Sequence, residues 1–132
     1  MKVELNHTVI VCRDKYASAR FWADILQLHI HGEFGPFVQV RTTNSVDLDF
    51  LTVTEGEDIT SQHYAFLVAD EVFDQGFARI KALGLQFQAD PHGKQIGEIY
   101  QYEGGRGVYF SDPNGHFLEM FTRTPGYGRT DG

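Results

Sequence analysis

Glu119 is an isolated carboxylate in the apolar run Phe117–Phe121, which has the composition of a β-strand. Burying an unpaired carboxylate is costly, so this residue predicts a cation nearby. A metal ion would supply that cation, and so would Arg106 or Arg123. The preceding Asp112–Gly115 segment, Asp-Pro-Asn-Gly, is typical of a tight turn, which makes Glu119 part of a predicted β-hairpin.

Two histidines and a second carboxylate repeat this pattern elsewhere in the chain. His7 and His63 each stand near the start of a predicted strand, and the same order of residue types (apolar, acidic, apolar, apolar, Thr) surrounds Asp49 and Glu119. Each residue alone is compatible with an ordinary solvated or hydrogen-bonded role. Together, two imidazoles and one or two carboxylates suit a divalent Fe, Mn, Ni, Co or Zn ion with positions left open for substrate. We therefore predict His7, His63 and Glu119 as metal ligands, with Asp49 as a fourth.

The elements that hold these residues form two similar halves. In the first half we expect a strand over Val3–Cys12, a helix that Asp14 caps and that extends to about Leu28, and strands over 30–34, 37–41 and 46–53. In the second half we expect a strand over 63–69, a helix that Asp70 caps, strands over 85–89 and 96–102, and the final hairpin.

This order predicts an α+β fold of two βαβββ modules, which form a cupped mixed sheet with the helices outside. Residues 1–132 are expected to be a single domain, with module 1 at about 3–53, a polar linker at 54–61 and module 2 at about 62–123. Because alternate residues of a strand share one face, Asp49 and Glu119 are both expected on the concave face.

The composition excludes several classes of protein. The net charge of −7 argues against binding to nucleic acid or to an anionic membrane surface. No apolar run approaches the ~20 residues needed to span a membrane, and no apolar signal segment follows Met1. The one cysteine, Cys12, rules out an internal disulfide framework and suits a reducing compartment. We expect a cytoplasmic protein that acts on a small molecule.

Three segments carry a resemblance to the vicinal oxygen chelate superfamily, which includes glyoxalases, bleomycin-resistance proteins and extradiol dioxygenases. They are Asn6–Thr8, His63–Phe66 and Tyr109–Glu119, and the last has the Asp-Pro-x-Gly turn four residues before its Glu. The resemblance covers about His7 to Arg123. It implies paired βαβββ modules around a metal that chelates two substrate oxygens. It also implies a homodimer, in some members with each site shared between chains.

The resemblance leaves the chemistry open among three classes. Glyoxalase I is similar in its plan of one His and one acid from each module, which implies lyase or isomerase chemistry with Glu119 as a catalytic carboxylate; this is our leading expectation. Extradiol dioxygenases come next, since Tyr109 matches their Tyr ten residues before the ligand Glu, although the acid–base His that their pattern has six to eight residues before this Tyr is missing at Gln101–Glu103. A metal-free drug- or metabolite-binding protein, like the bleomycin-resistance members, is the third.

Further polar residues are candidates for contact with substrate. Gln39 and Arg41 alternate with valines, so they are expected to line the cup, where Arg41 would bind an anionic group; a solvated position at the end of the strand is the alternative for Arg41. His92, Tyr102 and Arg106 lie on or beside the long segment 90–107, which is expected to cover the site. Tyr102 is a candidate general acid or base, and His92 and Arg106 are candidate substrate-binding residues.

Overall fold

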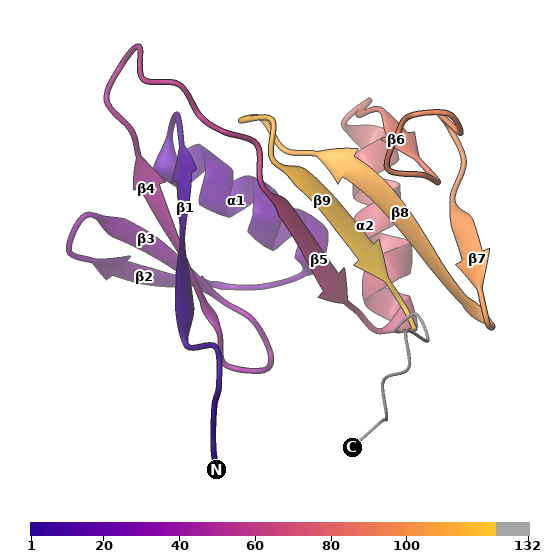
Figure 1. The fold of residues 1–132 in the computed structure, drawn as a ribbon, viewed down its shortest axis with the longest axis horizontal. Coiled ribbons are helices and arrows are strands. Elements are labelled where there is room, and N and C mark those ends of the chain that lie inside the picture. Colours follow the sequence, from indigo (N-terminus) through magenta and orange to yellow (C-terminus); the bar gives the residue numbers. More distant parts are fainter. Residues whose placement is uncertain (124–132) are drawn as a thin grey trace. The chain divides into compact units, whose positions relative to one another are not determined.

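The computed structural model of the chain describes residues 1–123, and residues 124–132 of the predicted domain lie outside the described part. The chain divides into two compact units. Unit 1 comprises Met1–Ser61 together with the short segment Asp112–His116, and unit 2 comprises Gln62–Ser111 together with the described residues that follow His116. Each unit contains one helix and one sheet, as the ribbon in Figure 1 shows.

Unit 1 has the βαβββ order predicted from the sequence. Its elements are β1 (His7–Cys12), α1 (Lys15–Leu26), β2 (Ile30–Phe34), β3 (Phe37–Arg41) and β4 (Asp47–Thr52). The sheet order is β1-β4-β3-β2, with β1 parallel to β4 and the other pairs antiparallel. The first strand begins four residues later than predicted, because β4 begins opposite His7; of the residues before His7, Asn6 still accepts a hydrogen bond from the backbone N–H of Asp47.

Unit 2 repeats this order and adds one short strand. Its elements are β5 (His63–Leu67), α2 (Asp70–Ala82), β6 (Phe87–Gln88), β7 (Tyr100–Tyr102), β8 (Gly105–Ser111) and β9 (Phe117–Phe121). The sheet order is β5-β9-β8-β6, and β7 also pairs with β8. β6 and β7 are shorter than the predicted 85–89 and 96–102: the Leu85 N–H bonds to the Ile80 carbonyl at the end of α2, and Ile96 forms an isolated bridge with Gln88 instead of extending β7. The α+β class and the two modules are therefore confirmed, with sheets of four and five strands.

The registers of the two sheets establish the internal repeat. In each parallel pair the carboxylate residue lies opposite the residue two positions after the histidine of the neighbouring strand: Asp49 opposite Val9, and Glu119 opposite Ala65. The antiparallel neighbours also correspond, because β3 pairs with β4 in unit 1 as β8 pairs with β9 in unit 2. Each His–carboxylate pair therefore has the same position within its own sheet.

The two helices begin differently. The carboxylate of Asp14 caps α1 as predicted, accepting from the backbone N–H groups of Tyr16 and Ala17 at 3.0 and 3.2 Å. The prediction that Asp70 caps α2 was wrong: Ala69 holds the cap position without a side-chain bond, and Asp70 is the first helical residue. Asp70 instead pairs with Arg106 and still favours the helix electrostatically, because its negative charge lies at the N-terminal end of the helix dipole. Among the described residues, neither helix is long and apolar enough to cross a membrane.

Alternation along the strands separates a core face from a polar face in each unit. In unit 1, α1 packs on the sheet, and Trp22 meets Phe50 edge-on with ring centroids 5.2 Å apart. In unit 2, Leu118 and Met120 of β9 are fully buried, whereas Glu119 between them points to the other face. The candidate ligands therefore lie on the sheet faces opposite the apolar cores.

The turn Asp112–His116 belongs to unit 1, although the sequence assigns it to the second module. His116 is fully buried, and its Nε2 donates to the Val11 carbonyl at 2.7 Å. The Asp112 carboxylate accepts from the Trp22 indole N–H at 2.9 Å, and the Asn114 amide donates to the Ser18 hydroxyl at 2.9 Å. This turn thus adds polar contacts to β1 and α1 of unit 1.

Candidate functional site

The strongest candidate site in unit 2 is the pair formed by His63 and Glu119. His63 Nε2 lies 3.3 Å from Glu119 Oε1, and the Glu119 side chain is 11% exposed. The other ring nitrogen of His63, Nδ1, lies 2.9 Å from the carbonyl oxygen of Phe117. A carbonyl only accepts hydrogen bonds, so Nδ1 carries the proton and Nε2 of a neutral ring presents a lone pair.

This arrangement fits a bound cation. With the ring neutral, the Nε2 lone pair and the carboxylate oxygen at 3.3 Å repel one another, and a cation bound by both atoms removes this repulsion, as a second proton on the ring also would. Metal-binding histidines commonly donate their second N–H to a backbone carbonyl, as His63 does to Phe117. The nitrogen and oxygen donors of unit 2 therefore suit a divalent first-row metal.

Aromatic rings surround this pair. Tyr109 stacks on Phe117 with centroids 5.3 Å apart and planes at 11°, and it also faces His63 at 6.2 Å. Tyr100 lies against Tyr109 at 5.8 Å, and its hydroxyl donates to Glu119 Oε2 at 2.5 Å. The sequence analysis named Tyr109 and Tyr102 but missed Tyr100. Tyr102 is on the same strand as Tyr100 and is 42% exposed.

Unit 1 contains the corresponding pair, His7 and Asp49. Asp49 is 4% exposed, and its Oδ1 accepts a hydrogen bond from Gln39 Nε2 at 3.0 Å. His7 is exposed, with Nδ1 2.9 Å from the Asn6 side-chain oxygen. Gln39 lies opposite Asp49 as Tyr109 lies opposite Glu119, so the two units carry different polar neighbours at equivalent positions.

A hollow of about 430 Å³ brings the predicted residues of unit 1 together. Its lining includes His7, Asp49, Gln39 and Arg41, all predicted from the sequence. It also includes apolar residues that the sequence analysis did not single out for the site: Val9, Phe34 and Phe37. The hollow thus combines predicted metal ligands, hydrogen-bonding groups and an aromatic wall.

Arg41 has a carboxylate partner within this hollow. Its Nε and Nη2 donate to the two oxygens of Asp47 at 2.8 and 3.2 Å. These hydrogen bonds hold the pKa of Asp47 below its usual value, against an opposing effect of partial desolvation. An anionic substrate group would compete with Asp47 for the guanidinium of Arg41.

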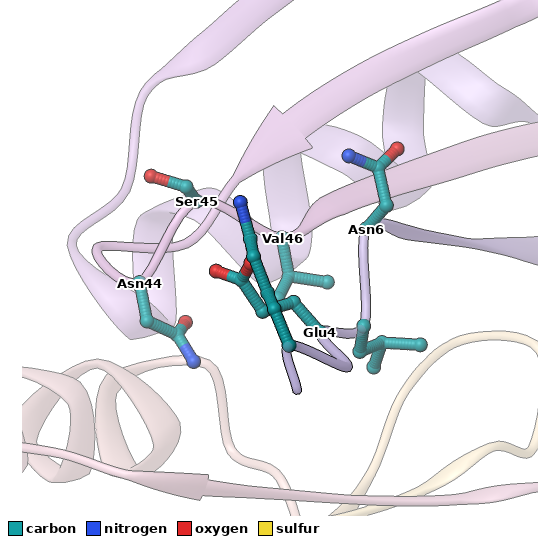
Figure 2. A pocket seen from close by; sticks show the side chains of 7 residues that line it. Glu4, Asn6, Asn44, Ser45 and Val46 are labelled. Atoms are coloured by element: carbon teal, nitrogen blue, oxygen red, sulfur yellow. The ribbon is translucent and has the colours of Figure 1, made fainter.

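A second hollow, of about 820 Å³, lies between the N-terminal segment and the β3–β4 turn of unit 1. Figure 2 shows Glu4, Asn6, Asn44, Ser45 and Val46 around it. Its lining has no histidine and no aromatic side chain, and its one carboxylate, Glu4, pairs with Lys2 at 2.9 Å. The residue types suited to metal or aromatic binding are in the smaller hollow.

The two loop candidates of unit 2 have different surroundings. Arg106 pairs with Asp74 at 2.7 Å and with Asp70 at 3.2 Å, and its guanidinium lies 4.5 Å from the ring centroid of Phe73. These contacts place Arg106 against α2 and not beside Glu119. His92 is exposed, in a turn whose amides bond to the Asp90 carboxylate.

Each unit by itself supplies one histidine and one carboxylate to the predicted set of four metal ligands. Across residues 1–123, no cluster of three or more His, Cys, Asp and Glu side chains suited to a metal is found. The full set of His7, His63, Glu119 and Asp49 therefore stays a prediction.

Comparison with known proteins gives relatives with enzyme names. The chain is 51% identical to the structure named oxidase ChaP-H2, with a TM-score of 0.91 over 98% of this chain and 100% of that one. It is 26% identical over 124 residues to the glutathione transferase FosA of Serratia marcescens, covering 91% of this chain and 81% of the relative.

A third relative supports the fold alone. The fosfomycin resistance protein FosX of Listeria monocytogenes, solved with Mn(II) and sulfate, is 22% identical, with a TM-score of 0.68 over 94% of this chain and 93% of that one.

The resemblance inferred from the sequence motifs is confirmed. Residues 4–120 match the Glyoxalase/Bleomycin resistance protein/Dioxygenase superfamily, and the chain belongs to this superfamily.

Proposed function

We propose that this chain is a metal-dependent oxidase that uses dioxygen to oxidise a small aromatic molecule with adjacent oxygen substituents. The observation that carries the proposal is the His63–Glu119 pair, whose Nε2 and Oε1 converge at 3.3 Å with Nδ1 bonded to a carbonyl. The proposed ligands are His63 and Glu119 with His7, and Asp49 as a fourth. A divalent metal held by them would act as a Lewis acid toward two substrate oxygens.

The chain's own residues suit an aromatic, oxygen-rich substrate. Phe34 and Phe37 give the unit 1 hollow a ring-binding wall, and Gln39 and Arg41 add groups that hydrogen-bond to oxygen. In unit 2, Tyr109 and Phe117 form a stacked pair beside His63, and this pair offers an aromatic ligand a flat apolar surface. Each unit by itself therefore has side chains suited to contact with such a substrate.

The choice of oxidation over lyase chemistry reverses the order expected from the sequence. It is supported by the 51% identity to a named oxidase along nearly the whole chain. Glyoxalase-like lyase or isomerase action is the second candidate, because the register repeats a His–carboxylate pair in both units, as the four-ligand plan of that class requires.

Metal content tests the shared part of both candidates. Protein purified without a histidine tag is analysed for bound metal as wild type, as His63→Ala and as His29→Ala, which removes an exposed histidine outside both pairs. We expect stoichiometric metal in wild type and His29→Ala and a loss in His63→Ala. Metal absent from all three would support the metal-free binding protein instead.

Substrate assays then separate the two reactions. Oxygen consumption is measured with catechols and other aromatic vicinal diols, and hemithioacetal conversion is measured with the same metal-loaded protein. The oxidase proposal expects oxygen uptake that depends on substrate and is lost in Glu119→Gln. Hemithioacetal turnover without oxygen uptake would support the lyase.

We also propose a cytoplasmic homodimer. The proposal rests on the superfamily membership and on the single, buried cysteine, which suits a reducing compartment. Sedimentation equilibrium is expected to give twice the mass of the chain, and a monomer at micromolar concentration would contradict the dimer.

A further inference from the structure

The two oxygens of Glu119 have different partners. Oε1 faces His63 Nε2 at 3.3 Å, whereas Oε2 accepts the hydroxyl proton of Tyr100 at 2.5 Å. A hydroxyl bonded to an ionised carboxylate is a strong, charge-assisted donor. In this buried position the bond also offsets part of the cost of desolvating the carboxylate.

Tyr100 reaches Glu119 from two strands away. Tyr100 on β7 is paired with Gly107 on β8, and β8 in turn pairs with β9, which carries Glu119. The ring of Tyr100 therefore crosses the face of β8 to bring its hydroxyl to β9.

Gly107 is what makes this crossing possible. A Cβ atom at Gly107 would lie 2.1 Å from Cζ, 2.3 Å from the hydroxyl oxygen and 2.5 Å from Cε2 of Tyr100. Such distances are well inside van der Waals contact. The φ angle of Gly107 is not positive, so the backbone there does not require glycine. Its role is to leave room for the ring.

We propose that Tyr100 is a positioning residue that reserves Glu119 Oε2, so that Glu119 offers the metal a single oxygen, with Gly107 supplying the space for the ring. The inference rests on the proposed metal-dependent function. Without the hydroxyl, both carboxylate oxygens become available and the side chain is free to rotate. The coordination geometry and the affinity for metal then change, although no ligand has been removed.

Cobalt(II) binding to the metal-free protein tests this without measuring turnover. Co²⁺ alone is titrated into wild type, Tyr100→Phe, Gly107→Ala and the double variant, and its visible absorption reports the coordination geometry. We expect Tyr100→Phe and Gly107→Ala each to weaken binding roughly 10–100-fold and to alter the spectrum. The double variant is expected to be no worse than the more affected single variant, since both changes remove one hydrogen bond.

Tyr16→Phe is the matched control. The Tyr16 hydroxyl also donates to a carboxylate oxygen at 2.5 Å, that of Glu33, but in an exposed position of unit 1. The Tyr16→Phe variant should bind Co²⁺ with the affinity and the spectrum of the wild type. If Gly107→Ala does not fold, Tyr100→Phe decides alone, because it keeps the ring and removes only the hydroxyl.

The outcomes separate this inference from the function on which it rests. Wild-type affinity and an unchanged spectrum in Tyr100→Phe, with binding lost in His63→Ala, would overturn the role of Tyr100 and leave the metal site standing. Failure of wild type to bind Co²⁺, or full binding by His63→Ala, would overturn both the metal site and this inference.

Discussion

The Asp112 carboxylate is buried, and both of its oxygens accept hydrogen bonds from N–H groups. Oδ2 accepts from Trp22 Nε1 and Asn114 Nδ2 at 2.9 and 3.0 Å, and Oδ1 accepts from the backbone amides of Asn114 and His116 at 2.8 and 2.9 Å. In Asp112→Asn, one side of the group becomes an NH₂ that faces donors. We expect a loss of about 1–3 kcal/mol of unfolding free energy by urea denaturation. Asp58→Asn, in an exposed loop, is the control, and an equal loss in both variants would contradict this role.

Some residues of the candidate site could be predicted from the sequence, and others could not. Glu119 was predictable because a carboxylate in an apolar strand requires a partner whatever the fold. Gln39 and Arg41 were predictable from alternation, and both line the unit 1 hollow. Tyr100 was not predictable, because its contact depends on the pairing of β7 with β8, which the turn between them sets and the sequence pattern does not reveal.

At the level of the elements, the Asp90 carboxylate holds the turn between β6 and β7 by accepting hydrogen bonds from three backbone amides. Desolvation by neighbouring atoms works to raise the pKa of Asp90, but hydrogen bonds from the amides of Lys94, Gln95 and His92 outweigh it and hold the pKa below its usual value. A group whose pKa is lowered by folding contributes its stabilisation above its unfolded pKa of about 3.9 and loses it as the pH falls through the folded value.

We therefore expect this turn to loosen in acid before the sheets do. In a pH titration followed by NMR, the amide signals of residues 92, 94 and 95 should move together with the Asp90 carboxyl carbon, at a midpoint below about 3.9. In Asp90→Asn the three amide signals should lose this pH dependence. A normal midpoint in wild type would show that the amides do not hold the carboxylate.

Arg106 connects β8 to α2, and its contacts predict a role in stability. It bonds to Asp70 and Asp74 and lies over the ring of Phe73. Arg106→Gln should cost about 1 kcal/mol in urea denaturation, the sum of partly exposed ion pairs and one cation–π contact. Arg20→Gln is the control, because its exposed pair with Asp24 at 3.9 Å should contribute little. A fall in substrate affinity without loss of stability would favour the substrate-binding role predicted from the sequence.

On the scale of the whole molecule, a bound metal should stabilise the folded chain by mass action. With free Mn²⁺ or Co²⁺ at about 100 times its dissociation constant, the expected gain is about 2.7 kcal/mol, which raises the melting temperature by roughly 10 °C. Chelation should reverse the gain in wild type, and His63→Ala should show neither effect. The check is differential scanning calorimetry with and without EDTA, and a melting temperature insensitive to metal in wild type would contradict the proposal.

The sequence by itself determined the fold class, the two modules and the family. These follow from local properties: alternation along strands, the cap at Asp14, turn residues between elements, and the recurrence of histidine and acid in equivalent strands. The register within each sheet then agrees with the repeat, because a shift by one residue would turn every buried side chain to the other face.

Only the tertiary structure decided which side chains meet. It gave Glu119 a hydroxyl partner from β7, placed Arg106 against α2, and included the Asp112–His116 turn in unit 1. These contacts join residues that are separated by loops, or by 90 positions or more as in the Trp22–Asp112 bond. Strand pairing and packing bring such residues together, and neither has a period that can be read along the chain.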